Sequence, residues 1–297
     1  QPANIGLTDR NPNREDGTKK FPCSSPKSGS FLTVFVNLEK FMKTEVQGNR
    51  KMMCTAPISG WKKITGGITS SLKDAYIDQP LTIRCGQCKA CRKTRALEWG
   101  IRCHHESKKY EENCFITPTF EDAHLPHDGS INRLDLQILI RDLRNAGIRL
   151  RYFGAGEYGD KTKRPHYHLC LFGYRPDDLE QVRDGPEPLW RSPFLEKIWG
   201  KGKIDVGNLT LGSSLYTSQY IQKKITGKKS EEFYKQEHPL TGEIFPVLPP
   251  FQMQSTKPGI GHGWISQWLH DVYPSDFVVI EGDKYKPPVF YDKICEK

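Results

Sequence analysis

Apolar residues recur along the chain in helical and in strand-like patterns. Segment 131–145 carries apolar side chains three and four residues apart, the spacing of an amphipathic helix. Segments 114–120, 149–158 and 165–174 have the composition of strands, and the polar segment 159–164 predicts a turn between the last two. Further helices are expected over 88–110, 190–199 and 213–225, and further strands over 203–206 and 277–281.

The order of these elements predicts the fold class. A strand, a helix, two strands, a second helix and a fourth strand follow one another between residues 114 and 206. That order favours an α+β fold, with an antiparallel ferredoxin-like sheet and helices on one face. We expect four regions: a disordered arm or extension over 1–51, a basic cysteine-rich segment over 52–112, a core over 113–230 and a C-terminal region over 231–297 packed on that core.

The charge balance indicates an acidic partner. The 297 residues include 44 Lys and Arg against 35 Asp and Glu, a formal net charge of +9. Such a balance favours nucleic acid as the partner. No stretch approaches the roughly 18 apolar residues of a membrane span. No signal peptide is seen either, so we expect a soluble intracellular protein without a membrane partner.

Three of the nine cysteines form a repeat with metal-ligand spacing. Cys85, Cys88 and Cys91 are separated by two residues each, a spacing at which thiolates bind zinc or an iron–sulfur cluster. A ferredoxin-type run needs a further cysteine where Arg95 stands, so structural zinc is favoured. Cys54 is the first choice for the fourth ligand. Reduced cysteines without a metal are the competing interpretation, and the alternative fourth ligands are Cys103, His104 and His105.

A second candidate metal site lies in the predicted strand that carries His166 and His168. Residues two apart in a strand point to the same face, so these side chains project together, roughly 7 Å apart at the backbone. Glu157 ends the preceding predicted strand, and the hairpin places it beside the start of the next as a third ligand. Two histidines and one carboxylate with open positions suit Mg²⁺ or Mn²⁺ when substrate phosphates supply further oxygens.

Other interpretations of the histidine pair stay open at this point. Strand histidines are often solvent-exposed or hydrogen-bonded structural residues, and cupins also carry a His-x-His pattern. Histidine-triad hydrolases need a third histidine two residues further on. Cys170 occupies that position, so the triad hydrolases are disfavoured.

A pair of tyrosines lies in the predicted helix over 213–225. Tyr216, Tyr220 and Lys224 are four residues apart, so their Cβ atoms follow one face at spacings of about 5–6 Å. A tyrosine can attack a phosphodiester and keep the 5′ phosphate as a covalent ester. Because free tyrosine has a pKa of about 10, it needs a metal on the scissile phosphate and a nearby lysine such as Lys224. An aromatic pair in the core is the competing interpretation.

Basic residues near these motifs are expected to contact DNA phosphates. Arg92 and Arg95 belong to the basic run around the cysteines. Arg164 adjoins the histidine pair, and Lys223 adjoins the tyrosine pair. Solvated basic residues on a surface are the ordinary alternative.

The motifs occur in an order that resembles a known superfamily. A strand at 115–119, the histidine pair and the tyrosine pair followed by two lysines are similar to the His-hydrophobic-His replication initiators, the rolling-circle endonucleases. The closer resemblance is to initiators of small single-stranded DNA phages, the gokushovirus branch of the microviruses, over about residues 52–295. Supporting segments are 85–92, 105–106, 156–159, 164–168 and 258–261.

The resemblance implies an activity and partners. Members nick single-stranded DNA at a phage origin, stay on the 5′ end through a phosphotyrosine, and religate a circular strand in rolling-circle replication. Metal-dependent cleavage, a ferredoxin-like sheet and catalytic roles for Tyr216 and Tyr220 follow from it. So do a host helicase and polymerase as partners and action in the cytoplasm of a bacterial host. Pro118 departs from the pattern, since the family usually has an apolar residue there, and we expect an edge or a bulge in that strand.

Three rival functions stay open from the sequence. A relaxase or transposase with the same chemistry is the nearest, although small transposases of this type usually carry one tyrosine on a shorter chain. The others are a non-catalytic zinc module that binds nucleic acid and a metal-dependent hydrolase without a covalent step. A covalent protein–DNA adduct distinguishes the tyrosine endonuclease from these last two.

Overall fold

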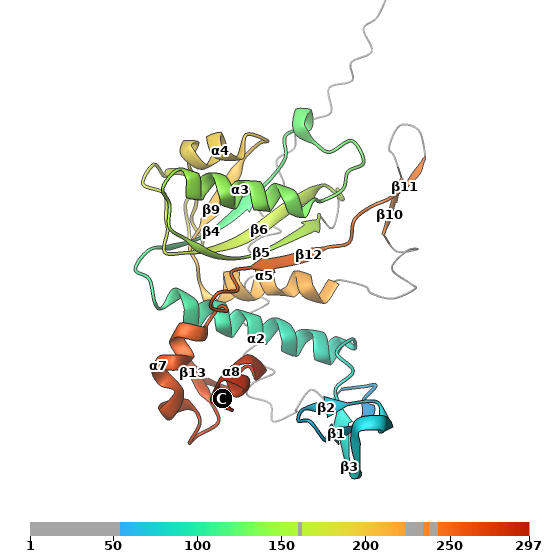
Figure 1. Cartoon of the computed structure of the whole chain (residues 1–297). Coiled ribbons are helices and arrows are strands. Elements are labelled where there is room, and N and C mark those ends of the chain that lie inside the picture. Colours follow the sequence, from blue (N-terminus) through green and yellow to red (C-terminus); the bar gives the residue numbers. More distant parts are fainter. Residues whose placement is uncertain (1–53, 160–161, 224–233, 238–242, 297) are drawn as a thin grey trace, which may run out of the picture.

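A seven-stranded antiparallel sheet forms the centre of the computed structural model (Figure 1), which describes residues 54–159, 162–223, 234–237 and 243–296. The strands follow in the order β12 (Phe251–Gln254), β5 (Arg151–Tyr158), β6 (Pro165–Phe172), β4 (Asn113–Pro118), β9 (Ile204–Gly207), β8 (Leu189–Arg191) and β7 (Glu180–Arg183).

The expected fold class is confirmed. Elements β4, α3 (Arg133–Asn145), β5, β6, α4 (Pro193–Trp199) and β9 follow in chain order, which is the βαββαβ plan. Helices α3 and α4 cover one face, as expected (Figure 1). The other face is covered as well, by α5 (Leu211–Lys223) and α2 (Lys89–Ser107). The reason lies in β6, where every residue from Tyr167 to Phe172 is buried, so both faces of the sheet need a cover.

Alternate strand residues build two separate cores. Toward α3 and α4, Leu169 of β6 lies in one cluster with Leu139 of α3. Toward α2 and α5, Phe153 of β5 and Cys170 of β6 lie in another cluster with Cys103 of α2. The side chains of the candidate active site therefore share one face of the sheet with the second of these cores.

Helices α2 and α5 lie against each other across the second face. Thr217 donates its hydroxyl to the Ser213 carbonyl at 3.0 Å, and Ser218 donates to the Ser214 carbonyl at 2.7 Å, which satisfies these buried hydroxyls inside the helix. Such small side chains allow α5 to lie close to its neighbours.

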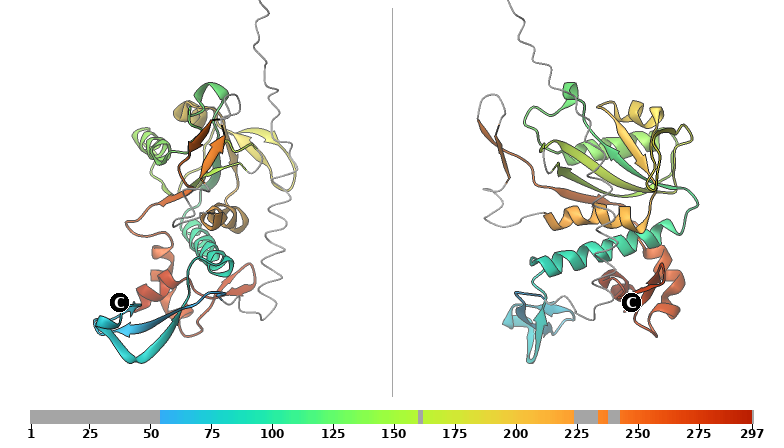
Figure 2. Two further views of the ribbon diagram at one scale, coloured as in Figure 1. Left: turned by 90° about the vertical axis from the view of Figure 1, so that its right-hand side faces the viewer. Right: turned by 180° about the vertical axis from the view of Figure 1, so that it is seen from behind.

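Two smaller groups of elements lie at the ends of α2 (Figure 2). A three-stranded sheet of β1 (Ile58–Lys63), β2 (Ile68–Thr69) and β3 (Ala75–Ile83), with the 3-10 turn η1 (Leu72–Asp74), precedes the helix. The C-terminal elements pack on Ile101 of α2 and Leu215 of α5. They are α7 (His262–Val272), β13 (Val278–Ile280), β14 (Asp283–Tyr285) and α8 (Val289–Cys295).

Three short elements complete the description. Strands β10 (Lys235–Glu237) and β11 (Ile244–Pro246) pair with each other, and a 3-10 turn η2 spans Asp122–His124. Among the described residues, none of the helices combines the length and the apolar content that crossing a bilayer requires.

The predicted elements of the core are present with shifted boundaries. The helix expected over 190–199 begins only at Pro193, because Ser192 caps it and proline suits the first helical turn, and residues 189–191 form β8 instead. The arm expected over 1–51 and the end of the helix expected over 213–225 lie outside the described residues.

Pro118 does not lie in an edge strand. Strand β4 lies between β6 and β9. Its ladder to β6 ends at Ile116, and an isolated bridge joins Thr119 to His166 beyond the proline. The edge alternative is therefore wrong, and the ladder is interrupted where proline has no N–H to donate.

Adding one methyl group at Gly100 tests the contact between α2 and α5. A Cβ there would clash with the Leu215 side chain, whose Cγ would lie at 2.9 Å. Overpacking costs about 1–3 kcal/mol, which exceeds the gain of about 1 kcal/mol that alanine brings to a helix. We expect Gly100→Ala to lower the free energy of unfolding in urea denaturation by about 1 kcal/mol.

Gly207→Ala in β9 is the matched control, because its Cβ would meet the Phe115 ring only at 3.7 Å, an ordinary contact. If both variants unfold at the same urea concentration as the native protein, the close approach of α2 and α5 contributes nothing measurable.

Candidate active site

The hairpin of β5 and β6 brings the predicted metal ligands together. In its antiparallel register Glu157 lies directly opposite His166, and Ala155 lies opposite His168. The turn is closed by the Gly159 N–H, which donates to the Arg164 carbonyl at 3.0 Å. Because residues two apart share a face, Glu157, His166 and His168 all project toward α5.

The three side chains converge on one point. His166 Nε2 lies 2.9 Å from Glu157 Oε1, and His168 Nε2 lies 3.3 Å from the same oxygen. Two ligands at right angles around a cation, each about 2.1 Å from it, are about 3.0 Å apart. The donor atoms thus have the spacing that neighbouring ligands of a small divalent cation adopt.

The other ring nitrogens of the histidines are bonded within the protein. His166 Nδ1 donates to the Arg164 carbonyl at 3.1 Å, and a carbonyl can only accept. His168 Nδ1 lies 3.3 Å from the Thr117 hydroxyl. An imidazole that carries a proton on Nδ1 can approach the carboxylate in two ways: as an imidazolium that also donates from Nε2, or as a neutral ring whose Nε2 lone pair binds a cation shared with the carboxylate.

Glu157 is buried, and its charge depends on the histidines. Burial alone would raise the pKa of the Glu157 carboxyl, but the hydrogen bonds from His166 and His168 outweigh this and lower the pKa to about 2. The carboxyl group is therefore ionised across the neutral range, as a metal ligand has to be.

Tyr216 is the tyrosine that the structure places at this site. Its ring centroid lies 5.1 Å from that of His168, edge to face, and 6.4 Å from that of Phe115. Phe115 in turn stacks on His168 with an interplanar angle of 9°. The predicted helix over 213–225 therefore delivers its first tyrosine to the face of the sheet that carries the histidine pair.

The structure describes only some of the other residues predicted for catalysis and DNA contact. Tyr220 and Lys223 belong to α5, the first of them one turn beyond Tyr216, while Lys224 lies outside the described residues. Arg164 contacts the Asp122 carboxylate at 2.6 Å and the Phe120 carbonyl at 3.0 Å, so its charge is already paired.

The two basic residues predicted beside the cysteines lie on α2, far along the chain from the histidine pair. Arg95 is exposed, and one of its Nη atoms lies over the loop at Gly86. Arg92 is half-buried in the first turn of the helix. Both therefore belong to the cysteine-bearing end of the molecule.

The three cysteines chosen from their spacing and the first choice of fourth ligand, Cys54, lie together where β3 leads into α2. Their sulfur atoms are within 4.8 Å of one another, and Cys54 and Cys88 are 3.9 Å apart. Four thiolates around zinc, with Zn–S bonds of about 2.3 Å, are about 3.8 Å apart. The first choice of fourth ligand thus joins the group, and the alternatives Cys103, His104 and His105 lie toward the other end of α2.

Backbone N–H groups point at these sulfurs, as they do around a bound metal. Cys85 N–H donates to Cys54 Sγ at 3.3 Å and Cys88 N–H to Cys85 Sγ at 3.3 Å. The Cys91 N–H lowers the pKa of the Cys88 thiol to about 5, whereas burial raises the pKa of Cys91 to about 11. At least one thiolate therefore forms readily at this end of α2.

Thr117 is the residue of this site that the sequence did not reveal. It lies two positions after Phe115 on β4, on the face that carries the histidines, and it is buried. Alternation along the predicted strand at 114–120 was the available signal. The alternation does not tell which strand lies beside β4. The histidine that Thr117 contacts could therefore not be predicted.

Replacing Thr117 by valine is expected to weaken divalent metal binding by about 10–100-fold, the usual effect of losing a hydrogen bond to a metal-ligating histidine. Valine keeps the shape but leaves His168 Nδ1 without the hydroxyl. Manganese titration followed by calorimetry measures the change. Thr117→Ser, which keeps the hydroxyl, should retain most of the affinity, and an unaltered Thr117→Val would contradict the role.

The cysteine group predicts a zinc content. Protein purified without chelator should carry about one zinc per chain, as a four-cysteine site does, and Cys88→Ser should lose it with a fall in melting temperature. Atomic emission spectrometry and thermal denaturation measure the two effects. Cys295→Ser, at an exposed cysteine in α8, is the control, and full zinc retention in Cys88→Ser would rule the site out.

Known proteins resemble this chain over most of its length. It is 32% identical over 260 residues to the replication-associated protein VP4 of Bdellovibrio phage phiMH2K, covering 83% of this chain and 78% of that protein. It is 32% identical over 232 residues to the replication-associated protein ORF2 of Spiroplasma virus 4, covering 73% and 68%. No solved structure matches the chain.

Two further findings agree. A similarity of 28% identity over 151 residues relates the chain to the replication-associated protein ORF4 of Chlamydia phage 1, covering 47% of this chain and 38% of that protein. Residues 113–225 match the family model described as replication-associated protein ORF2/G2P. The chain therefore belongs to the family of microvirus-like phage replication-associated proteins.

Proposed function

We propose that this protein initiates phage DNA replication by nicking single-stranded DNA at the origin through a covalent 5′-phosphotyrosine, and that it rejoins the strand after a rolling-circle round. The observation that carries the proposal is the 5.1 Å separation between the rings of Tyr216 and His168, within a group that also contains Glu157 and His166. A phenol and three metal-ligand atoms on one face are the parts that metal-assisted transesterification needs.

The chemical step exchanges one phosphodiester for another. The phenolic oxygen of Tyr216 bonds to the scissile phosphorus, and the bond from phosphorus to the 3′ oxygen breaks. The phenol loses a proton and the departing 3′ oxygen gains one, so no water or other reactant is consumed. The ligands Glu157, His166 and His168 would hold Mg²⁺ or Mn²⁺, which withdraws charge from the phosphate.

Tyr220 supplies a second nucleophile in this proposal. It follows Tyr216 by four residues in α5, and this spacing predicts that the two tyrosines share one side of the helix. While one tyrosine holds the first 5′ end, the other attacks the regenerated origin, which releases a circle. We assign Lys224 to charge stabilisation beside them, and Arg92, Arg95, Arg164 and Lys223 to DNA contacts.

The proposed activity also implies the partners of the protein and the place where it acts. A nicked strand with a free 3′ end needs a helicase and a polymerase, which a small phage takes from its bacterial host, so we place the protein in the host cytoplasm. A relaxase or transposase role would use the same chemistry. The naming of the relatives as replication-associated proteins favours the replication role.

Adduct formation tests the proposal. Single-stranded oligonucleotides tiled across the genome that encodes the chain are incubated with Mn²⁺ and separated on denaturing gels. One oligonucleotide is expected to give a covalent adduct, which Tyr216→Phe combined with Tyr220→Phe abolishes because no phenol remains. His166→Ala with His168→Ala should lower the adduct yield by at least about 100-fold.

Tyr174→Phe is the control, since Tyr174 follows the end of β6 that is farther from the histidines. Cleavage without an adduct would identify a hydrolase. An adduct that survives in the double-tyrosine variant would exclude the tyrosine mechanism.

A further inference from the structure

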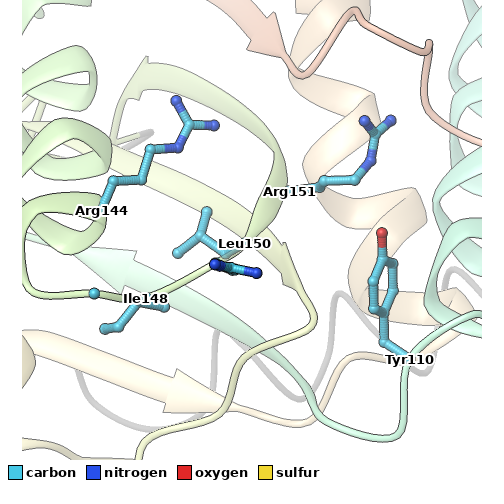
Figure 3. A pocket seen from close by; sticks show the side chains of 7 residues that line it. Tyr110, Arg144, Ile148, Leu150 and Arg151 are labelled. Atoms are coloured by element: carbon cyan, nitrogen blue, oxygen red, sulfur yellow. The ribbon is translucent and has the colours of Figure 1, made fainter.

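A hollow in the surface lies at the opposite end of the main sheet from the histidine pair. Its polar side chains are Tyr110, Arg144, Arg149 and Arg151. Figure 3 shows Arg144 on one side and Tyr110 with Arg151 on the other, with Leu150 between them. None of the described residues that line this hollow carries a carboxylate.

The charges in the hollow are only partly compensated. Arg151 is held by the Glu106 carboxylate at 2.6 Å and by the Pro258 carbonyl at 2.7 Å, so its position is fixed and its charge is paired. Arg144 and Arg149 are exposed, and neither forms an ion pair within the part of the chain that the structure describes. Two positive charges therefore face the hollow without a counter-ion from the described residues.

A phenol completes the set of donors. The Tyr110 hydroxyl makes no hydrogen bond among the described residues, and it belongs to the lining of the hollow. Burial, together with the charge of Glu106, raises the pKa of Tyr110. The group thus stays protonated and can donate to an anion.

The backbone brings Arg144 and Arg149 together. Helix α3 ends in a left-handed glycine, Gly147 (φ 88°), whose N–H donates to the Arg144 carbonyl at 2.9 Å. The next N–H, of Ile148, donates to the Leu143 carbonyl at 3.2 Å. This closed helix end reverses the chain within a few residues, so both arginines are carried by one rigid turn.

We propose that this hollow binds a backbone phosphate of the DNA substrate at a distance from the cleaved bond. The inference rests on the proposed function, because it takes single-stranded DNA as the ligand. Guanidinium groups and a phenol are donors that suit phosphate oxygens. Arg151 and Glu157 are six residues apart on β5, about 20 Å. The contact therefore lies several nucleotides from the nick.

Binding of a fluorescein-labelled dT30 strand, followed by anisotropy over a range of salt concentrations, tests the proposal. We expect Arg144→Gln with Arg149→Gln to weaken binding about tenfold at low salt. Losing the contact to this one phosphate should also reduce the slope of log affinity against log salt by about 0.7. Neither arginine forms an ion pair with another described residue, so the fold is expected to survive both substitutions.

The matched control removes two positive charges from nearby surface. Arg141→Gln with Lys197→Gln changes exposed residues of α3 and α4 outside the hollow, and Arg141 already pairs with Asp142 at 2.8 Å. Its dT30 affinity and salt slope should stay close to native. Equal losses in both double variants would reduce the effect to total charge and overturn the site, as would native binding in Arg144→Gln with Arg149→Gln.

Titration calorimetry with inorganic phosphate separates a DNA phosphate from a free anion. Tight binding of phosphate alone, lost in Arg144→Gln with Arg149→Gln, would assign the hollow to a small anion and overturn the proposal. Weak or absent heat, together with the dT30 result, supports it. Because dT30 binding is read without cleavage, a failure to form the tyrosine adduct would leave this test intact.

Discussion

The buried carboxylate of Glu157 is the constraint on which the site depends. A buried carboxylate whose charge is not compensated costs about 3–5 kcal/mol. Glu157 therefore stays buried only because His166 and His168, or a cation between them, compensate its negative charge. The pairing of β5 with β6 provides this. A slip of one residue would turn both histidines to the other face of the sheet, and the site would disappear with the register.

Tyr167, between the two histidines, fixes that register from the opposite face. It is fully buried toward α3, where its hydroxyl donates to the Asp135 carboxylate at 2.6 Å and accepts from the Asn132 N–H at 3.0 Å. Strand β6 thus makes polar contacts on both faces: Tyr167 binds the start of α3 on one face, and the histidine pair contacts Glu157 on the other. The start of α3 therefore contributes to the geometry of a site that it does not touch.

The sequence was informative wherever a local period decides the geometry. Strand alternation and a short turn were enough to place Glu157 beside His166, and the x2 spacing of the cysteines was enough to bring three sulfurs together. Pairings across long stretches of chain were not predictable in this way. Strand β12 joins β5 although about a hundred residues separate Gln252 from its partner Ala155, and no local pattern encodes such a partner. The cover of α2 and α5 over the second face was missed for the same reason.

The position of Tyr216 depends on that cover. Tyr216 reaches His168 only because α5 lies between the sheet and α2, and α5 fits there because four of its buried residues are serine or threonine and Gly100 of α2 leaves room for Leu215. Helix α2 is in turn tied at its end, where Glu106 binds Arg151 of β5 and the Gly261 N–H. Its 19 residues span about 28 Å, with the cysteine group at the start. One continuous helix thus links the cysteine group, the tyrosine helix and the sheet.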